Sequence, residues 1–160
     1  MYLGKFTLNT LCATKNIASL LFKLSKAGDM FALSGDIGVG KTTFVRYFIN
    51  QAVSGTKVPS PSYNLYFRYE CSKAPIYHLD AWRIEKSYEV LNLGIADCFK
   101  ESIFLVEWPN KIEKYLPSCK LDIKLEYYKH LRTIIFHGDE KWKTRLEKKI
   151  NREFIENKIK

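Results

Sequence analysis

Apolar residues recur at helical spacing in two stretches of the first third of the chain. In residues 15–27, "KNIASLLFKLSKA", the apolar residues on one helical face are Ile17, Leu20, Leu21 and Leu24. In a second stretch, the residues with this spacing are Phe44, Val45, Phe48, Ile49 and Ala52. Spacings of three and four residues place side chains on a single face of an α-helix. The sequence therefore predicts two amphipathic helices, the first of which ends at Gly28 and Asp29.

Shorter apolar runs between turn residues predict the strands of a sheet. The runs are "MFALS" (30–34), "IYHLD" (76–80), "IFLVE" (103–107), "LDIKLEYY" (121–128) and "RTIIFH" (132–137). Residues 63–69 show the alternation of a half-exposed strand instead, and residues 85–99 have the pattern of another helix. Strands interleaved with helices predict an α/β fold with a mainly parallel central sheet flanked by helices. The last two strands are close enough in sequence to form an antiparallel hairpin.

Length and composition are those of one domain. The chain has 160 residues, of which 46% are hydrophobic and 14% aromatic, enough to bury one sizeable core. Its four cysteines are scattered without a Cys-x-x-Cys pair, so we expect reduced thiols rather than a disulfide framework or a zinc site. We expect a cytoplasmic protein without membrane association, because the sequence has no long apolar run and no signal-peptide layout.

The net charge is +9, and the last 22 residues carry part of it. Residues 139–160 contain eight Lys or Arg and five Asp or Glu, so they supply +3 and the rest of the chain about +6. A basic surface favours nucleotides, RNA or an acidic partner protein, because its summed charge attracts anions. Ordinary solvated lysines explain the same charge equally well, so charge alone identifies no partner.

Three glycines, a lysine and two threonines stand between the run 30–34 and the second predicted helix, in "SGDIGVGKTTFV". They match the pattern G-x-x-x-x-G-K-[ST], and a strand before and a helix after are the context that this motif requires. Glycines let backbone N–H groups turn toward phosphate oxygens, and the helix adds its positive end. We expect Lys41 to reach the β- and γ-phosphates of a nucleoside triphosphate, and Thr42 to offer its hydroxyl to Mg²⁺. The predicted nucleotide-binding residues here are Gly35, Asp36, Ile37, Gly38, Val39, Gly40, Lys41, Thr42 and Thr43.

Two carboxylates follow predicted buried strands. Asp80 ends the run 76–80 and Glu107 ends the run 103–107. The carboxyl ends of parallel strands lie at one edge of an open sheet, where ligands bind, so both side chains are expected near the glycine loop. An acidic residue at such a strand end can hold Mg²⁺ or orient a water molecule. Each is also explained as a polar residue leaving a strand, but the loop beside them favours the first interpretation.

Five segments together resemble the TsaE family of bacterial P-loop ATPases. They are "GDIGVGKTTFVR", "VPSPSYNLYFRY", "IYHLDAWRI", "LGIADCF" and "LVEWPNKIEKYLP", and the resemblance covers residues 10–137. It implies a P-loop NTPase-like fold, ATP and Mg²⁺ as cofactors, and a slow ATPase that serves threonylcarbamoyladenosine modification of tRNA beside the anticodon. It also implies action with the TsaB–TsaD complex, whose turnover the ATPase sustains, and through it an indirect relation to tRNA; whether the chain also contacts tRNA directly is left open.

The resemblance implies roles for single residues. Glu107 falls on the family's second Mg²⁺ position, after Thr42, and Asp80 on its catalytic carboxylate, so Lys41 and Asp80 are the expected catalytic residues. Trp108 falls on a tryptophan near the nucleotide, although an aromatic plug at the sheet edge is an alternative interpretation.

Three further positions resemble the family less closely. Thr14 and Arg132 fall near positions that touch the base and the phosphates, or they simply pack. Residues 60–65, "SPSYNL", fall on a switch-like loop. The family usually has threonine at the third position of this loop, where Ser62 keeps the hydroxyl and lacks the methyl group. The three histidines have no metal-ligand spacing, so packing is the better explanation for each.

The C-terminal tail differs from a typical family member. We divide the chain into an ATPase domain, residues 1–138, and a basic tail, residues 139–160, which is expected to be helical. Apolar residues recur there every four positions, at Trp142, Leu146, Ile150 and Phe154. The helix is expected to pack on the domain or to serve as a docking surface for a partner protein or tRNA.

Two other functions remain open at this point. A small-metabolite kinase has the same loop, but this chain is short, and residues between the second helix and Asp80 predict a strand hairpin rather than a helical lid. A nucleotide-gated binding module with little hydrolysis is the other alternative. Asp80 and Glu107 favour hydrolysis over such a module.

Overall fold

The computed structural model describes residues 1–153, with side chains through residue 149. The strands are β1 (Tyr2–Leu8), β2 (Met30–Ser34), β3 (Tyr66–Tyr69), β4 (Ile76–Asp80), β5 (Ile103–Glu107), β6 (Leu121–Tyr128) and β7 (Leu131–His137). The α-helices are α1 (Leu11–Leu24), α2 (Lys41–Ala52) and α3 (Glu140–Glu153). Four 3-10 segments span Ser87–Leu93, Ala96–Cys98, Pro109–Lys111 and Glu113–Tyr115.

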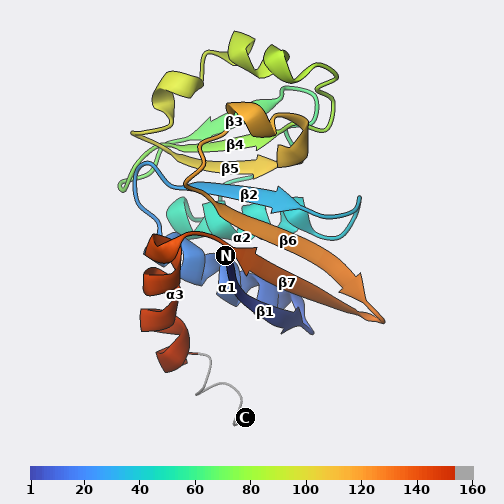
Figure 1. Ribbon diagram of the computed structural model, residues 1–160, viewed down its shortest axis with the longest axis vertical. Coiled ribbons are helices and arrows are strands. Elements are labelled where there is room, and N and C mark those ends of the chain that lie inside the picture. The colour runs from blue at the N-terminus through green and yellow to red at the C-terminus, as the bar shows by residue number, and fades with distance from the viewer. Residues whose placement is uncertain (154–160) are drawn as a thin grey trace.

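The seven strands form one sheet in the order β1-β7-β6-β2-β5-β4-β3 (Figure 1). The four middle strands, β6, β2, β5 and β4, run parallel to one another. At the two edges, β3 pairs antiparallel with β4, and β7 pairs antiparallel with β6 and with β1. The predicted α/β class, the mainly parallel central sheet and the C-terminal antiparallel hairpin are therefore confirmed.

Each face of the sheet is covered by its own cluster of apolar side chains. Along β5, Ile103 and Leu105 belong to a cluster that also contains residues of α1, α2 and α3. Phe104 and Val106 belong to a second cluster, shared with the 3-10 segments. Successive side chains of a strand point to opposite faces, so a strand that is covered on both sides has an unbroken apolar run. This explains why β2, β4 and β5 could be predicted at their observed bounds.

Several elements differ from the sequence-based expectation. The first helix, expected over residues 15–27, spans Leu11–Leu24 instead. The N-terminal strand β1 was not predicted, because it is an edge strand that buries only Leu8 and so lacks a clear apolar pattern. The helix expected over residues 85–99 is wrong, because the chain forms two 3-10 segments there. The first of them ends at Leu93, because the next residue, Gly94, has a φ of 63° and so leaves the helical region. The strand expected over residues 63–69 begins only at Tyr66.

The C-terminal helix α3 packs on the domain. Trp142 and Leu146 are buried in the same cluster as α1 and α2, and the Trp142 ring centroid lies 5.2 Å from that of Phe31. Arg145 Nη1 forms an ion pair of 2.6 Å with Asp29 Oδ2, beside the start of β2. The other two members of the predicted stripe, Ile150 and Phe154, lie outside the described side chains. Residues 140–149 of α3 therefore pack against the core and do not project away from the domain.

Within residues 1–153, no helix has both the length and the apolar character needed to cross a lipid bilayer.

We expect Trp142→Ala to lower the free energy of unfolding by roughly 3–5 kcal/mol, because a large aromatic side chain leaves a cavity when it is removed from a core. The indole is only 3% exposed. Denaturant unfolding followed by circular dichroism measures the effect, with Lys148→Ala, at an exposed site on the same helix, as the control. A loss as small as that of the control would show that α3 does not contribute to the core.

Candidate functional site

The glycine loop connects β2 to α2 and needs glycine for steric reasons. Ser34 ends β2, and α2 begins at Lys41, directly after Gly40. Gly35 has a φ of 132°, and a Cβ atom there would lie 2.1 Å from the carbonyl oxygen of Leu125. Gly40 has a φ of 114°, in the left-handed region that side chains disfavour. The backbone can therefore turn at both ends of the loop only because these positions lack a side chain.

The side chain of Lys41 contacts both the glycine loop and Trp108. Its ammonium group donates hydrogen bonds to the carbonyl oxygens of Gly35 (2.7 Å) and Asp36 (2.8 Å), and it lies 3.9 Å from the ring centroid of Trp108. Burial lowers the pKa of Lys41, and the nearby carboxylates of Glu107, Asp80 and Asp36 oppose that shift. The lysine is thus held inside the loop, between an aromatic face and three acidic groups.

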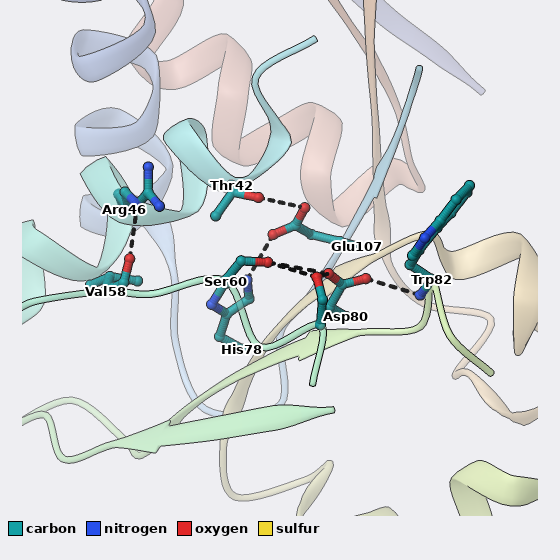
Figure 2. A network of polar contacts seen from close by, with 9 residues as sticks. Thr42, Arg46, Val58, Ser60, His78, Asp80, Trp82 and Glu107 are labelled. Carbon is teal, nitrogen blue, oxygen red and sulfur yellow. Dashed lines mark hydrogen bonds and ion pairs between the residues drawn. The ribbon is translucent and has the colours of Figure 1, made fainter. Parts of the chain in front are cut away.

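Glu107 joins three elements of the fold. Thr42 Oγ1, in the first turn of α2, donates a hydrogen bond of 3.0 Å to Glu107 Oε2. The Nε2 atom of His78 on β4 lies 2.8 Å from Glu107 Oε1. Figure 2 shows the glutamate between these two partners. Both oxygens of this carboxylate therefore have fixed partners, although the side chain is almost completely buried.

Asp80 stands opposite Glu107 in the register of β4 and β5. Its Oδ1 atom accepts a hydrogen bond from the backbone N–H of Trp82 at 2.9 Å. Its Oδ2 atom accepts from Ser62 Oγ and, at 3.4 Å, from Ser60 Oγ (Figure 2). Both serines belong to the segment 60–65, so this segment contacts the carboxylate directly. Ser62 makes its contact through the side-chain hydroxyl.

A cavity of about 320 Å³ opens between these groups. Its lining residues come from the glycine loop, from α2, from the segment 60–65 and from the ends of β4 and β5; they are Ile37, Gly38, Gly40, Lys41, Thr42, Thr43, Ser60, Ser62, Asp80, Trp82, Glu107 and Trp108. Most of the residues predicted from sequence are thus brought together. Gly35 and Asp36 contribute through their carbonyl contacts with Lys41.

A smaller cavity of about 60 Å³ lies at another side of the loop. Thr14, Arg132, Val39 and Thr43 line it, together with Gly38 and Gly40. The Nε atom of Arg132 is buried and has no hydrogen-bond partner among the described residues. The fold therefore brings Thr14 and Arg132 together, and it places a buried cationic donor without a partner among the described residues beside the loop.

Sequence reasoning missed three residues of this site. His78 was assigned to packing, although its place two residues before Asp80 puts both side chains on the same face of β4. Trp82 follows Asp80 by two residues, and its ring lies 4.5 Å from that of Trp108. Tyr127 donates from its hydroxyl to the Gly38 carbonyl oxygen at 3.2 Å. The strand period could have indicated His78, but nothing in the sequence indicated Tyr127.

The residues present fit a nucleoside triphosphate with Mg²⁺. Mg²⁺ prefers oxygen ligands and is usually bound by one or two protein groups together with phosphate oxygens and water. Thr42 and Glu107 supply such a pair. Among the described residues, no three His, Cys, Asp or Glu side chains form a metal site of their own. The loop N–H groups and the unpaired Arg132 Nε are donors that suit phosphate oxygens.

We expect Gly35→Ala to destabilise the protein more than Gly38→Ala, and to weaken nucleotide binding. The new methyl group at residue 35 would meet the Leu125 backbone, whereas residue 38 has a φ of 78° and no atom within 4 Å of a Cβ. The second change therefore carries only the cost of the left-handed conformation, about 1 kcal/mol. Thermal unfolding and calorimetric ATP titration measure both effects. Equal losses in the two variants would show that the contact with Leu125 does not constrain the loop.

Similarity to known proteins agrees with this geometry. A family model described as "Threonylcarbamoyl adenosine biosynthesis protein TsaE" matches residues 8–134. The tRNA threonylcarbamoyladenosine biosynthesis protein TsaE of Rickettsia conorii is 34% identical over 124 residues, which are 75% of this chain and 69% of that protein. The protein of the same name from Bacillus subtilis is 37% identical over 114 residues, 71% of each chain.

A solved structure has the same fold. The crystal structure of YdiB from Bacillus subtilis matches with a TM-score of 0.78 and 29% identity, over 92% of this chain and 95% of that one. The family match covers the glycine loop, both carboxylates and the segment that contacts them. This chain belongs to the TsaE family of threonylcarbamoyladenosine biosynthesis proteins.

Proposed function

We propose that this chain binds ATP with Mg²⁺ on the loop of residues 35–42, hydrolyses the ATP, and thereby sustains threonylcarbamoyladenosine modification of tRNA beside the anticodon. The observation that carries the proposal is the hydrogen bond of 3.0 Å between Thr42 and Glu107 at the end of this loop. A hydroxyl and a carboxylate in contact, beside a phosphate-binding type of loop, are the protein ligands that a nucleotide-bound Mg²⁺ requires. In the family context, ATP is the expected nucleotide.

The binding part of the proposal rests on the donors around the loop. Lys41 already lies among the loop carbonyls and next to Trp108, so a small rearrangement brings its ammonium group to the phosphates. Arg132 and Thr14 provide further polar groups in the adjoining cavity. When bound, Mg²⁺ supplies positive charge that offsets the charge developing on the transferred phosphoryl group.

The hydrolytic part rests on Asp80. The Asp80 carboxylate lines the cavity beside Glu107, its partner in the register of β4 and β5. There it can orient an attacking water molecule or accept a proton from it. Its Oδ2 atom accepts hydrogen bonds from Ser60 and Ser62, so a water molecule competes with both serines for this oxygen until the segment 60–65 shifts. This arrangement supports slow hydrolysis by the isolated protein and faster hydrolysis when the segment moves.

We infer that the binding of a partner protein shifts the segment 60–65. Tyr63 directly follows Ser62 in this segment and is 82% exposed. The Arg83 guanidinium lies 4.1 Å from the centroid of the Tyr63 ring. An exposed aromatic residue beside a cation is suited to protein contact. We therefore assign the surface at residues 60–65 to a TsaB–TsaD-like complex. The relation of this chain to tRNA is then indirect, through that complex.

The two alternative functions make different predictions about turnover. A small-metabolite kinase needs an acceptor site, but the chain between α2 and Asp80 contains the antiparallel pair β3 and β4 instead of a helical lid. A nucleotide-gated binding module agrees with the engagement of Asp80 by the serines, and it predicts little hydrolysis even with partners. Measurement of phosphate release separates the module from the ATPase.

We expect Asp80→Asn to lower the rate of ATP hydrolysis on the order of 100-fold, while ATP affinity changes less than about threefold. The amide keeps the shape of the side chain but cannot act as a base, and general-base catalysis typically contributes at least this factor. Single-turnover hydrolysis and calorimetry measure the two quantities, with the exposed Asp97→Asn as the matched control. Equal losses of affinity and of turnover would contradict the catalytic assignment.

We expect a TsaB–TsaD complex to increase ATP hydrolysis strongly, up to roughly a thousandfold if it also supplies a stabilising cation. Tyr63→Ala should reduce this stimulation more than the basal rate, because Tyr63 belongs to the proposed contact surface. Tyr2→Ala is the matched control, since Tyr2 is also exposed but lies on β1, at the opposite edge of the sheet. Phosphate release that is equally fast with and without the complex would contradict partner gating.

A further inference from the structure

His78 is a buried polar residue in the middle of the sheet. It lies on β4 between Phe67 of β3 and Leu105 of β5 in the strand register, and its side chain is fully buried. Its ring makes a single hydrogen bond within the described structure, from Nε2 to Glu107 Oε1 at 2.8 Å. The other ring nitrogen, Nδ1, is buried without a partner among the described residues. An imidazole in this place is costly, since burying an unpaired polar atom disfavours the folded state.

The direction of the hydrogen bond follows from the chemistry of the carboxylate. A glutamate that binds a cation carries no proton, so it can only accept hydrogen bonds. Nε2 of His78 must then carry the hydrogen and donate it to Glu107 Oε1. The other ring nitrogen, Nδ1, has no partner among the described residues. Through Nε2, the imidazole holds one chosen oxygen of the glutamate.

The two oxygens of Glu107 are consequently distinguished. His78 occupies Oε1 from the sheet side, and Thr42 Oγ1 lies 3.0 Å from Oε2 on the side of the glycine loop. Figure 2 shows the Glu107 carboxylate between the side chains of Thr42, from α2, and His78, from β4. Rotation of the carboxylate would break the contact with His78. The oxygen beside Thr42 is therefore held in place before any ligand binds.

We propose that His78 is a positioning residue for magnesium: it holds the Glu107 carboxylate so that Oε2 stays beside the Thr42 hydroxyl, and so sets the affinity for the Mg²⁺ that accompanies the nucleotide. The inference rests on the proposed nucleotide function. It assigns to His78 an effect on the metal rather than on the phosphates, which the loop itself holds. Residues that orient metal ligands in this way typically change metal affinity 10–100-fold when they are replaced.

The test compares two amides at one position. In His78→Gln the amide nitrogen can reach the place of Nε2 and donate to Glu107, whereas in His78→Asn the shorter side chain cannot. We would titrate MgCl₂ into each variant with a non-hydrolysable ATP analogue, and follow nucleotide binding by calorimetry and by the fluorescence of Trp82 and Trp108, which line the cavity. Binding in EDTA gives the metal-free affinity, and thermal unfolding without Mg²⁺ gives the stability.

We expect His78→Asn to raise the half-saturating Mg²⁺ concentration 10–100-fold, with the affinity in EDTA changed less than about twofold. His78→Gln should stay within about threefold of the wild type. Leu105→Ala, at the fully buried neighbour of His78 on β5, is the stability control; it should lower the unfolding temperature without shifting the Mg²⁺ dependence. If His78→Asn does not fold, His78→Met replaces it, since methionine fills the space and cannot donate.

Several results would overturn the inference. One is a Mg²⁺ dependence of His78→Asn that equals that of His78→Gln. Another is a shift in Leu105→Ala as large as that in His78→Asn, because both effects would then reflect stability alone. A loss of affinity in EDTA equal to the loss in Mg²⁺ would also contradict a metal-specific effect. If the wild type itself binds the nucleotide equally well with and without Mg²⁺, the proposed magnesium site fails, and that outcome is distinct from the other three.

Discussion

The parallel register of β2, β5 and β4 is the constraint on which the site depends. Leu33 of β2 pairs with Glu107 of β5, which pairs in turn with Asp80 of β4. The three strands therefore end together, and the glycine loop begins only two residues beyond Leu33. A shift of one residue in β4 or β5 would turn its carboxylate toward the opposite face of the sheet, and a shift in β2 would move the glycine loop. The apolar side chains that cover both faces exclude such a shift, so the core fixes the position of the polar groups.

The charged and polar side chains of the site are almost completely buried, and each is held by contacts with the loop or the sheet edge. Lys41, His78, Asp80 and Glu107 are each at most 5% exposed, and each contacts another member of the loop or of the sheet edge. The cavity formally contains one positive side chain, Lys41, and two negative ones, Asp80 and Glu107. A divalent cation would change the sign of this balance and so favour a polyphosphate, whereas a polyphosphate alone would meet two carboxylates. The charges thus explain why metal and nucleotide are expected to bind together.

Prediction from sequence succeeded where a short stretch of sequence reflects the burial or the backbone conformation of its own residues. The strands β2, β4 and β5 are mainly apolar because both of their faces are buried, and the glycine loop is recognisable because its backbone tolerates no Cβ at Gly35. The edge strand β1 was not predicted because only Leu8 of its seven residues is buried. The role of His78 was not predicted because it depends on a contact with Glu107, 29 residues later, and only the strand register brings the two residues together. The contacts of Ser60 and Ser62 with Asp80 are likewise tertiary, and Thr14 and Arg132 were indicated only by family resemblance.

The central claim is that Thr42 and Glu107 hold a nucleotide-bound Mg²⁺ at the end of the glycine loop. A crystal structure with a non-hydrolysable ATP analogue and Mn²⁺ in place of Mg²⁺ tests it most directly, because the anomalous scattering of manganese locates the metal independently of the protein. The account predicts one manganese peak in contact with Thr42 Oγ1, on the Oε2 side of Glu107, with the phosphates in the loop. A peak elsewhere, or phosphates bound outside residues 35–42, would contradict it.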